Sequence, residues 1–199
     1  MYYCKKLKHI ALFDFDGTLT KNDTFITFGH FCNGALKLCI SIIKTAPWLI
    51  GWKLGVISNS TAKERLFREL YRGMDYETFK KKGQEFSAII NQSVRNDTMK
   101  YLQWHKKQGH YIAIVSASIT EWIEPWAKIN GVNTVIATTP EVIEGKLTGR
   151  FSSPNCHGEE KVNRIKAELG DLNCCEIWGY GDSSGDDAML AISTHPQKL

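Results

Sequence analysis

Several features that would place the chain in a special class are missing from it. The 199 residues contain no internal repeat, no low-complexity linker, and no Cys-x-x-Cys pair among six cysteines. Because metal-finger spacing is also absent, a zinc finger is excluded. The sequence has no dense basic run and no nucleic-acid-binding motif, so nucleic acid is not an expected partner. We interpret the cysteines as buried thiols of a protein in a reducing compartment, which predicts a cytoplasmic location.

A long uninterrupted hydrophobic run is absent too. The most apolar segment, 35–57, is interrupted by three lysines and divided by Pro47, so it falls short of the roughly 18 apolar residues of a membrane span. We expect this segment to pack within the protein, and peripheral membrane contact through 35–57 is the alternative. The first apolar run ends at Asp14, which is not the pattern of a signal peptide.

Arginine and glutamate are missing from residues 1–60, which carry seven lysines and three aspartates. This third of the chain therefore holds the whole formal net charge of +4, and the remaining residues balance to zero. An excess of lysine in one segment favours an anionic substrate or an anionic lipid surface. The overall composition, 43% apolar and 23% charged, is that of an ordinary globular protein.

Predicted strands alternate with predicted helices over most of the chain. Apolar runs predict strands at 9–15, 111–116, 133–137 and 174–180, and two glycines predict a hairpin at 141–151. Helices are expected at 24–57 with a break near Pro47, at 61–73 behind a capping box of Thr61 and Glu64, at 75–91, at 95–108, after a cap of Ser118 and Glu121, and at 158–169.

This order predicts an α/β fold, with a Rossmann-like three-layer core around a parallel sheet. The long helical stretch between the first and second strands far exceeds what a crossover needs. We therefore predict two domains: a Rossmann-like catalytic core made of 1–20 and 95–199, and an inserted helical cap domain at 21–94.

The most informative segment is Leu-Phe-Asp-Phe-Asp-Gly-Thr at 12–18. Asp14 and Asp16 are two residues apart at the end of an apolar strand, so both carboxylates point to one face. Two like charges there would repel each other unless a cation, a shared proton or a reaction compensates. Such an arrangement is a candidate for chemistry.

Further polar residues follow the other predicted strands. Ser116 ends the second strand, Asp182 and Asp186 follow the fourth, and Lys161 begins the helix before it. In an open α/β sheet ligands bind at the carboxyl ends of the strands, so these groups should converge. Carboxylate oxygens with room for water suit Mg²⁺. A phosphate held by the hydroxyl and the ammonium would complete the charge balance.

In these segments the chain resembles the haloacid dehalogenase superfamily of phosphohydrolases. The four segments that carry the resemblance are Asp14-Phe15-Asp16-Gly17-Thr18, Ile114-Val115-Ser116-Ala117-Ser118, Gly158-Glu159-Glu160-Lys161 and Gly181-Asp182-Ser183-Ser184-Gly185-Asp186-Asp187. The helical cap between the first two is similar to that of the phosphoserine phosphatase-like branch.

The resemblance implies a role for each residue. Asp14 would be the nucleophile that forms an aspartyl-phosphate, and Asp16 the proton carrier. Mg²⁺ would be held by the Asp14 carboxylate, the Asp16 carbonyl and Asp182, with Asp186 in a supporting position. Phosphate and substrate would contact a set of residues that includes the catalytic lysine: Thr18, Asp23, Ser116, Ala117, Lys161 and Gly185.

The resemblance leaves the substrate open. Relative to phosphoserine phosphatases, Asp23 replaces a glutamate, Ala117 a glycine and Gly185 an asparagine. Three cap arginines compete for the substrate carboxylate: Arg65, Arg68 and Arg72. We expect hydrolysis of a small phosphorylated metabolite; alternatives are phosphoserine and transfer of the phosphate to an acceptor hydroxyl. A lipid phosphate is a further alternative, because Gly179-Tyr180-Gly181-Asp182 also resembles the C-type phosphatidylglycerophosphate phosphatases. The oligomeric state stays open.

Overall fold

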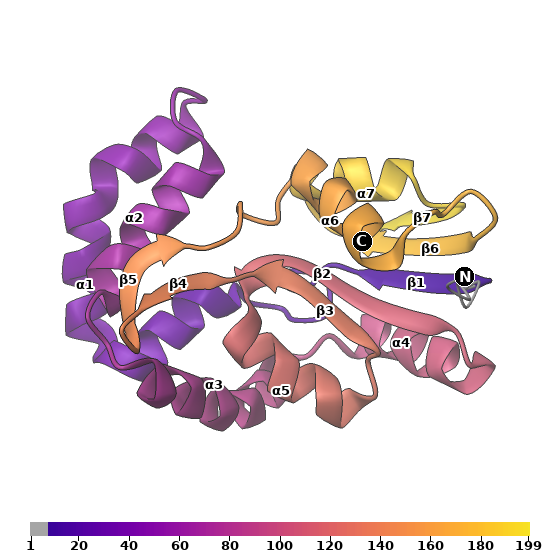
Figure 1. Cartoon of the computed structure of the whole chain (residues 1–199), viewed down its shortest axis with the longest axis horizontal. Helices are drawn as coiled ribbons and strands as arrows, with labels where there is room; N and C mark the ends of the chain where they lie inside the picture. Colours follow the sequence, from indigo (N-terminus) through magenta and orange to yellow (C-terminus); the bar gives the residue numbers. More distant parts are fainter. Residues whose placement is uncertain (1–7) are drawn as a thin grey trace.

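A five-stranded parallel sheet forms the centre of the computed structural model, which describes residues 8–199 (Figure 1). Cys4 and the lysines at 5 and 6 lie outside the described residues. The strand order is β3-β2-β1-β6-β7. The strands are β1 His9–Phe13, β2 Tyr111–Ile119, β3 Thr134–Thr138, β6 Glu176–Gly181 and β7 His195–Lys198, and a separate antiparallel hairpin joins β4 Pro140–Ile143 to β5 Lys146–Phe151.

Helices cover both faces of this sheet. They are α1 Thr24–Lys53, α2 Asn59–Tyr71, α3 Tyr76–Ile90, α4 Asn96–Gln108, α5 Thr120–Asn130, α6 Glu159–Leu169 and α7 Asp187–Ala191, with short 3₁₀ helices η1 Asn91–Ser93 and η2 Ser184–Asp186. In Figure 1, α4 and α5 lie below the sheet and α6 and α7 above it. The predicted α/β class and the three-layer Rossmann-like core are confirmed.

The central strand β1 is buried on both faces, as its continuous apolar sequence predicts. Ala11 and Phe13 belong to the cluster under α4 and α5, whereas Ile10 and Leu12 belong to the cluster under α6 and α7. This alternation follows from the two-residue period of a strand. Both faces are therefore fixed by packing, and the polar residues after Phe13 emerge at one defined edge.

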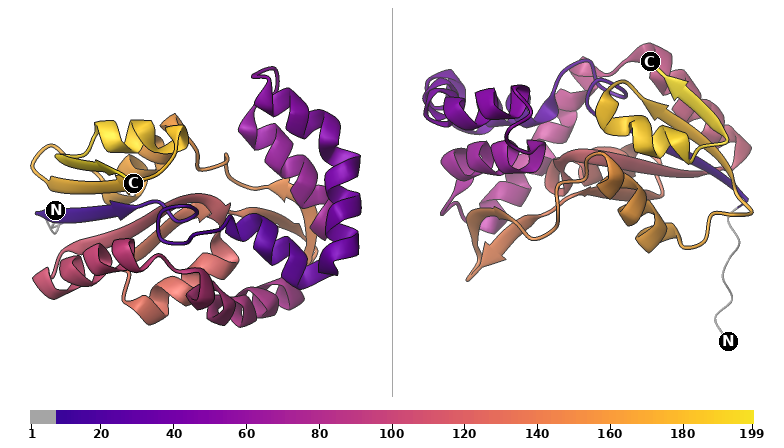
Figure 2. Two further views of the ribbon diagram at one scale, coloured as in Figure 1. Left: turned by 180° about the vertical axis from the view of Figure 1, so that it is seen from behind. Right: turned by 90° about the horizontal axis from the view of Figure 1, so that it is seen from above.

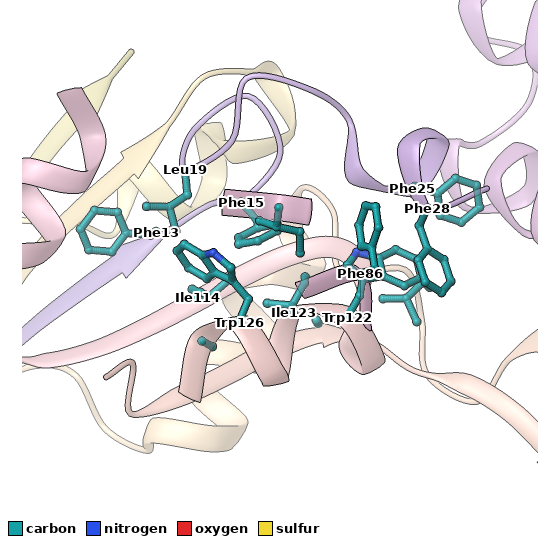
Figure 3. Close-up of a cluster of buried hydrophobic side chains, with 14 of the residues drawn as sticks. Phe13, Phe15, Leu19, Phe25, Phe28, Phe86, Ile114, Trp122, Ile123 and Trp126 are labelled. Atoms are coloured by element: carbon teal, nitrogen blue, oxygen red, sulfur yellow. The ribbon is translucent and has the colours of Figure 1, made fainter. Parts of the chain in front are cut away.

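An aromatic core continues from the sheet into the helices that follow β1 (Figure 3). Phe15 packs edge-on against Trp126 of α5, with ring centroids 5.3 Å apart. Phe28 of α1 lies 4.4 Å from Trp122 of α5. Large aromatic side chains bury much apolar surface in specific geometry, so α1 is anchored to the core at its first turns.

The helices α1, α2 and α3 occupy the segment predicted as the cap. In Figure 2, α1 and α2 stand beyond the end of the sheet. The chain leaves and re-enters the core through adjacent segments, because Lys21 N donates to Ser93 O at 2.7 Å and Arg95 N donates to Leu19 O at 2.9 Å. We keep 21–94 as the proposed cap. The hairpin also joins it, since Gly73 N donates to Leu147 O at 2.8 Å.

Two expectations about helix boundaries in the cap are wrong. The non-helical residue within 24–53 is Gly34, with φ of 75°, and the helix continues through Pro47. Pro47 is exposed, so the carbonyl that loses its partner there can be solvated. The helix α2 begins two residues before Thr61, and its N-cap is Ser58, whose hydroxyl accepts from Thr61 N at 3.1 Å.

Other differences lie in the core. No side chain caps α5 at Ile119, because strand β2 extends through Ser118 and the hydroxyl of that residue is used elsewhere. The edge strand β7 was not predicted, since its four residues contain a proline and two charged or titratable side chains but no apolar alternation. Cys156 is buried as expected, whereas Cys39 and Cys174 are exposed.

Candidate active site

A cavity of about 400 Å³ opens where the carboxyl ends of β1 and β2 meet α1 and α2. Its floor carries Asp14, Asp16, Ser116 and Lys161, all predicted as site residues. The remaining lining consists of polar loop residues and of apolar side chains from α1 and α2: Asp23, Phe25, Ile26, Leu49, Trp52, Asn59, Ala62, Lys63, Leu66, Ala117, His157, Ser183, Ser184, Gly185 and Asp186. The structure thus brings the predicted strand-end residues together.

Lys161 is buried at the centre of the site and bridges two carboxylates. Its Nζ lies 2.7 Å from Asp14 Oδ1 and 2.5 Å from Asp186 Oδ1, and it donates to Val115 O at 2.8 Å. Burial alone would lower the pKa of Lys161, but Asp14 and Asp186 raise it above its ordinary value. The lysine is therefore a fixed positive charge beside Asp14.

Asp14 is 6% exposed and follows β1 directly. Its backbone N donates to Tyr180 O at 2.9 Å, which extends the pairing of β1 with β6 by one residue. Burial raises the pKa of Asp14 to about 7, although Lys161 opposes the shift. Further positive charge at this carboxylate would favour its ionised form.

Three carboxylates approach closely enough to hold a cation. Ligand oxygens of Asp14, Asp182 and Asp186 lie within 4.8 Å of one another. Both Asp186 oxygens are already engaged, Oδ1 by Lys161 and Oδ2 by backbone N–H groups of Asp182 and Ser183. This leaves Asp14 and Asp182 as the carboxylates best able to bind a metal, and Asp186 as a residue that orients them.

The hydroxyl of Thr18 forms a hydrogen bond with this group of carboxylates and does not line the cavity. Thr18 is buried, and its Oγ1 donates to Asp182 Oδ1 at 3.3 Å. Burial raises the pKa of Asp182, and the nearby Asp186 adds to the shift. Gly17 makes the approach feasible: its φ is 83°, and a Cβ there would lie 2.2 Å from Asp182 Oδ2.

Asp16 is held by hydroxyl and amide donors instead of a cation. The Ser118 hydroxyl donates to its Oδ2 through a short hydrogen bond. Its Oδ1 accepts from Thr24 N at 2.8 Å and from Thr24 Oγ1 at 2.6 Å. Burial raises the pKa of Asp16, and Asp23 raises it further. The two aspartates therefore have different surroundings, as their different predicted roles require.

The remaining predicted residues surround the cavity. Ser116 is buried, and its Oγ accepts from Ser118 N at 3.0 Å. Asp23 caps α1, where its carboxylate accepts from Phe25 N at 2.9 Å. Gly185 lines the wall where a Cβ would meet His157 Nε2 at 2.6 Å. No side chain larger than glycine fits there without displacing that histidine.

Lys63 is the cap residue that the sequence interpretation missed. Its Nζ donates to Ala117 O at 2.9 Å and lies 4.8 Å from the centre of the Phe25 ring. Burial lowers its pKa, and Asp23 and Asp16 oppose the shift. A lysine four residues before the buried Phe67 stands on the apolar face of α2, and this was the signal in the sequence.

The three arginines considered for substrate binding lie elsewhere. Arg65, Arg68 and Arg72 line a separate groove between α1 and α2, with Lys44 and Trp48. Arg65 stacks over the Trp48 ring at 5.1 Å. Among the described residues of the cap, Lys63 is the cation that lines the catalytic cavity.

The sheet topology and this acidic, lysine-bearing site define a Rossmann-like enzyme of the kind that the sequence motifs suggested. The family model for haloacid dehalogenase-like hydrolases matches residues 11–191, and the chain belongs to this family.

Individual relatives agree with this assignment. Protein CicA of Caulobacter vibrioides is 28% identical over 187 residues, covering 92% of this chain and 82% of that protein. A protein of unknown function from Bordetella pertussis Tohama I has the same fold, with a TM-score of 0.76, 23% identity, and coverage of 94% of this chain and 87% of that one. A phosphoserine phosphatase, solved as an analogue of its phospho-aspartyl intermediate, gives a TM-score of 0.62 at 20% identity, covering 94% and 84%.

The family match confirms the predicted resemblance to this superfamily and the enzyme class at the level of a hydrolase, and the solved phosphoserine phosphatase shares the fold.

Proposed function

We propose that the chain is a Mg²⁺-dependent phosphomonoester hydrolase that acts through an aspartyl-phosphate on Asp14. The observation that carries this proposal is the position of Asp14, which is buried at the floor of the cavity and held 2.7 Å from Lys161. A carboxylate beside a fixed ammonium is arranged to meet the phosphoryl group, and the positive charge reduces repulsion between the two anions.

The residues present fit a magnesium ion. Asp14 and Asp182 offer carboxylate oxygens that lie close together, and within the described part of the chain Asp182 forms no ion pair, although Lys161 lowers its pKa from a distance. Mg²⁺ would be held by these two carboxylates and by the Asp16 carbonyl, with Asp186 orienting its neighbours. When bound, the ion supplies positive charge that stabilises the transferred phosphoryl group.

Different residues act as nucleophile, as proton carrier and as phosphate-binding groups. Asp14 attacks phosphorus while the bond to the leaving oxygen breaks, and that oxygen takes a proton from the Asp16 carboxyl. Asp16 then accepts a proton from the water that attacks the aspartyl-phosphate, which releases inorganic phosphate and restores Asp14. Lys161 and Ser116 contact the phosphoryl oxygens, and Thr18 supports Asp182.

The substrate that we propose is a small phosphorylated metabolite. A cavity of about 400 Å³ suits a small ligand. Lys63 and Asp23 face its upper part, which favours a substrate with polar or charged groups beyond the phosphate. The phosphoserine phosphatase among the structural neighbours supports phosphoserine as one member of this class. We also propose that the protein is cytoplasmic. The free thiols of Cys39 and Cys174 are exposed, and exposed thiols persist in a reducing compartment.

A lipid phosphate is the second candidate, and one observation favours it. The outer wall of the cavity is apolar, since Ile26, Leu49 and Trp52 of α1 line it together with Leu66 of α2. Such a wall could accept an acyl chain.

The test is a panel of phosphomonoesters assayed with Mg²⁺ and with EDTA. We expect turnover of soluble monoesters that EDTA abolishes and Mg²⁺ restores, and loss of turnover in Asp14→Asn with unchanged folding. Turnover in Asp14→Asn at the wild-type rate would overturn the proposal. Activity confined to lipid micelles would select the second candidate. Release of dephosphorylated product in excess of phosphate would indicate transfer to an acceptor hydroxyl.

A further inference from the structure

The outward side of α1 carries an exposed apolar face. Its members recur at spacings of four and three residues, which places them on one side of a helix. The α1 outer face consists of Leu36, Ile40, Ile43, Pro47 and Ile50, together with Leu54, the C-cap residue of the helix. Leu36 is 76% exposed, Ile43 72% and Leu54 73%. Exposed apolar side chains are ordinary when scattered, whereas a continuous row of them marks an interaction surface.

Lysines flank this face on both sides. At about 100° per residue, Lys37 and Lys44 project to one side of the row and Lys53 projects to the other. The Lys37 ammonium is held by Asn33 Oδ1 at 2.7 Å and by Leu70 O at 3.2 Å. Between Asp23 and Glu64 the sequence contains no acidic residue. An apolar face bordered by long cationic side chains is the pattern of a helix that lies in a lipid interface, where the ammonium groups reach the headgroups.

The cationic character continues beyond Lys44. The adjoining groove has a volume of about 500 Å³ and is lined by Arg65, Arg68 and Arg72, with Glu69 as its acidic member. Lys44 Nζ lies 3.5 Å from that glutamate, and these two charges offset each other. The three arginines therefore give this side of the face a net positive charge. Anionic headgroups would meet complementary charge along the whole edge.

The opposite side of α1 is already occupied. Its buried residues Leu38, Ser41 and Thr45 face α2, while Thr24 at its first turn bonds Asp16 in the active site. Contrary to the expectation from the sequence, α1 is long and apolar enough to cross a membrane by length and composition alone, and only 22% of its most apolar window is buried in the protein. A crossing would strip α1 from α2, whereas contact in the plane of the interface leaves every one of these packing contacts intact.

We propose that the α1 outer face docks the cap on an anionic lipid surface. A second copy of the chain fits less well, because an isologous contact along this row would bring two sets of lysines together. The inference concerns binding and holds whether or not the substrate is itself a lipid.

The experiment is sedimentation of the full chain with vesicles in the absence of substrate. Vesicles containing phosphatidylglycerol are compared with vesicles of phosphatidylcholine alone, at low and high salt. We expect binding to the anionic vesicles that salt weakens, and at least tenfold weaker binding for Ile43→Glu and for the milder Ile43→Gln. The matched control is Ile129→Glu on α5, where the isoleucine is 71% exposed; it should bind as the wild type does.

The proposal would be overturned by no binding to anionic vesicles, by equal binding of the folded Ile43 variants, or by equal binding to both vesicle types. A dimer in solution that Ile43→Glu dissociates would likewise overturn it and assign the α1 outer face to a second copy. Since no turnover is measured, failure here is separate from failure of the proposed hydrolase activity.

Discussion

The ammonium of Lys63 on α2 donates a hydrogen bond to the carbonyl oxygen of Ala117, 54 residues further along the chain, at 2.9 Å. This bond joins the proposed cap to the carboxyl end of β2, in the cavity that also holds Asp14 and Asp16. Ala117 follows Ser116, and both residues line the candidate cavity together with the lysine. The cap therefore takes part in the site through a cation as well as by covering it.

Replacing this lysine should weaken substrate binding more than it slows the chemical step. We expect Lys63→Met to raise KM at least tenfold, because an anionic substrate loses its cap cation, with a smaller change in kcat. Lys63→Arg should recover part of the loss. The measurement is steady-state kinetics on a soluble phosphomonoester.

The control for this change is Arg65→Met, which removes a cation from the neighbouring groove against Trp48. An equal rise in KM for Arg65→Met, or an unaltered KM in Lys63→Met, would contradict a role for Lys63 in the cavity.

Ser118 offers a test of how Asp16 is positioned. Ser118→Ala removes the hydroxyl that donates to Asp16 Oδ2 and leaves the two donors of Thr24 in place. A hydrogen bond to a charged group contributes about 1.5–3 kcal/mol, so we expect kcat to fall roughly 10- to 100-fold with little change in KM. The matched control is Ser87→Ala in α3, whose buried hydroxyl bonds the carbonyl of Gln84. If both variants retain the wild-type kcat, Ser118 does not orient the proton carrier.

The sequence predicted the core of the fold well because its signals are local. The buried strand before Asp14 and the four polar segments at strand or helix ends needed only the period of a strand and the rule that ligands bind at carboxyl edges. The helix from Asn96 also ends where Gly109 predicted it, with φ of 70° at that glycine. These features do not depend on distant contacts.

What the sequence could not supply depends on tertiary contacts. Ser118 looked like a helix cap because its local pattern with Glu121 fits one, yet β2 continues through it and its hydroxyl meets Asp16. Lys63 belongs to the site only because α2 folds back over β2. Arg65 resembled a site residue by charge, but helical geometry turns it into the neighbouring groove. The positions of these side chains depend on packing between segments that are far apart in the sequence.

Gly17 should be required for the acidic site rather than for folding alone. A Cβ at this position would lie 2.2 Å from Asp182 Oδ2, so Gly17→Ala must displace that carboxylate. We expect Mg²⁺ to bind at least tenfold more weakly, as measured by titration calorimetry. The matched control is Gly73→Ala, where φ is 80° and no described residue comes within 4 Å of the new Cβ. Gly73→Ala should lose about 1–2 kcal/mol of stability and keep its Mg²⁺ affinity; equal affinity in both variants would show that Asp182 is not a ligand.

Glu121 should make the stability of the protein depend on pH. Its side chain is buried on α5, where Oε1 accepts from the Tyr76 hydroxyl at 2.9 Å and Oε2 has no hydrogen-bond partner among residues 8–199. Burial raises the pKa of Glu121 to about 7, and the Tyr76 hydrogen bond opposes the shift. An unfolded glutamate titrates near 4.3, so between these values the folded protein retains a proton that the unfolded chain releases.

The contribution of Glu121 to the unfolding free energy should therefore be largest below about pH 4. It should fall as the pH rises toward 7. The fall is up to about 3 kcal/mol from the size of the shift. Glu121→Gln, which stays neutral and can still accept from Tyr76, should lose this part of the slope in denaturant titrations between pH 4.5 and 8. Glu168→Gln, at an exposed position on α6, should keep it. An unchanged slope in Glu121→Gln would mean that Glu121 is ionised in the folded protein, with a cation or water at Oε2 that compensates its burial.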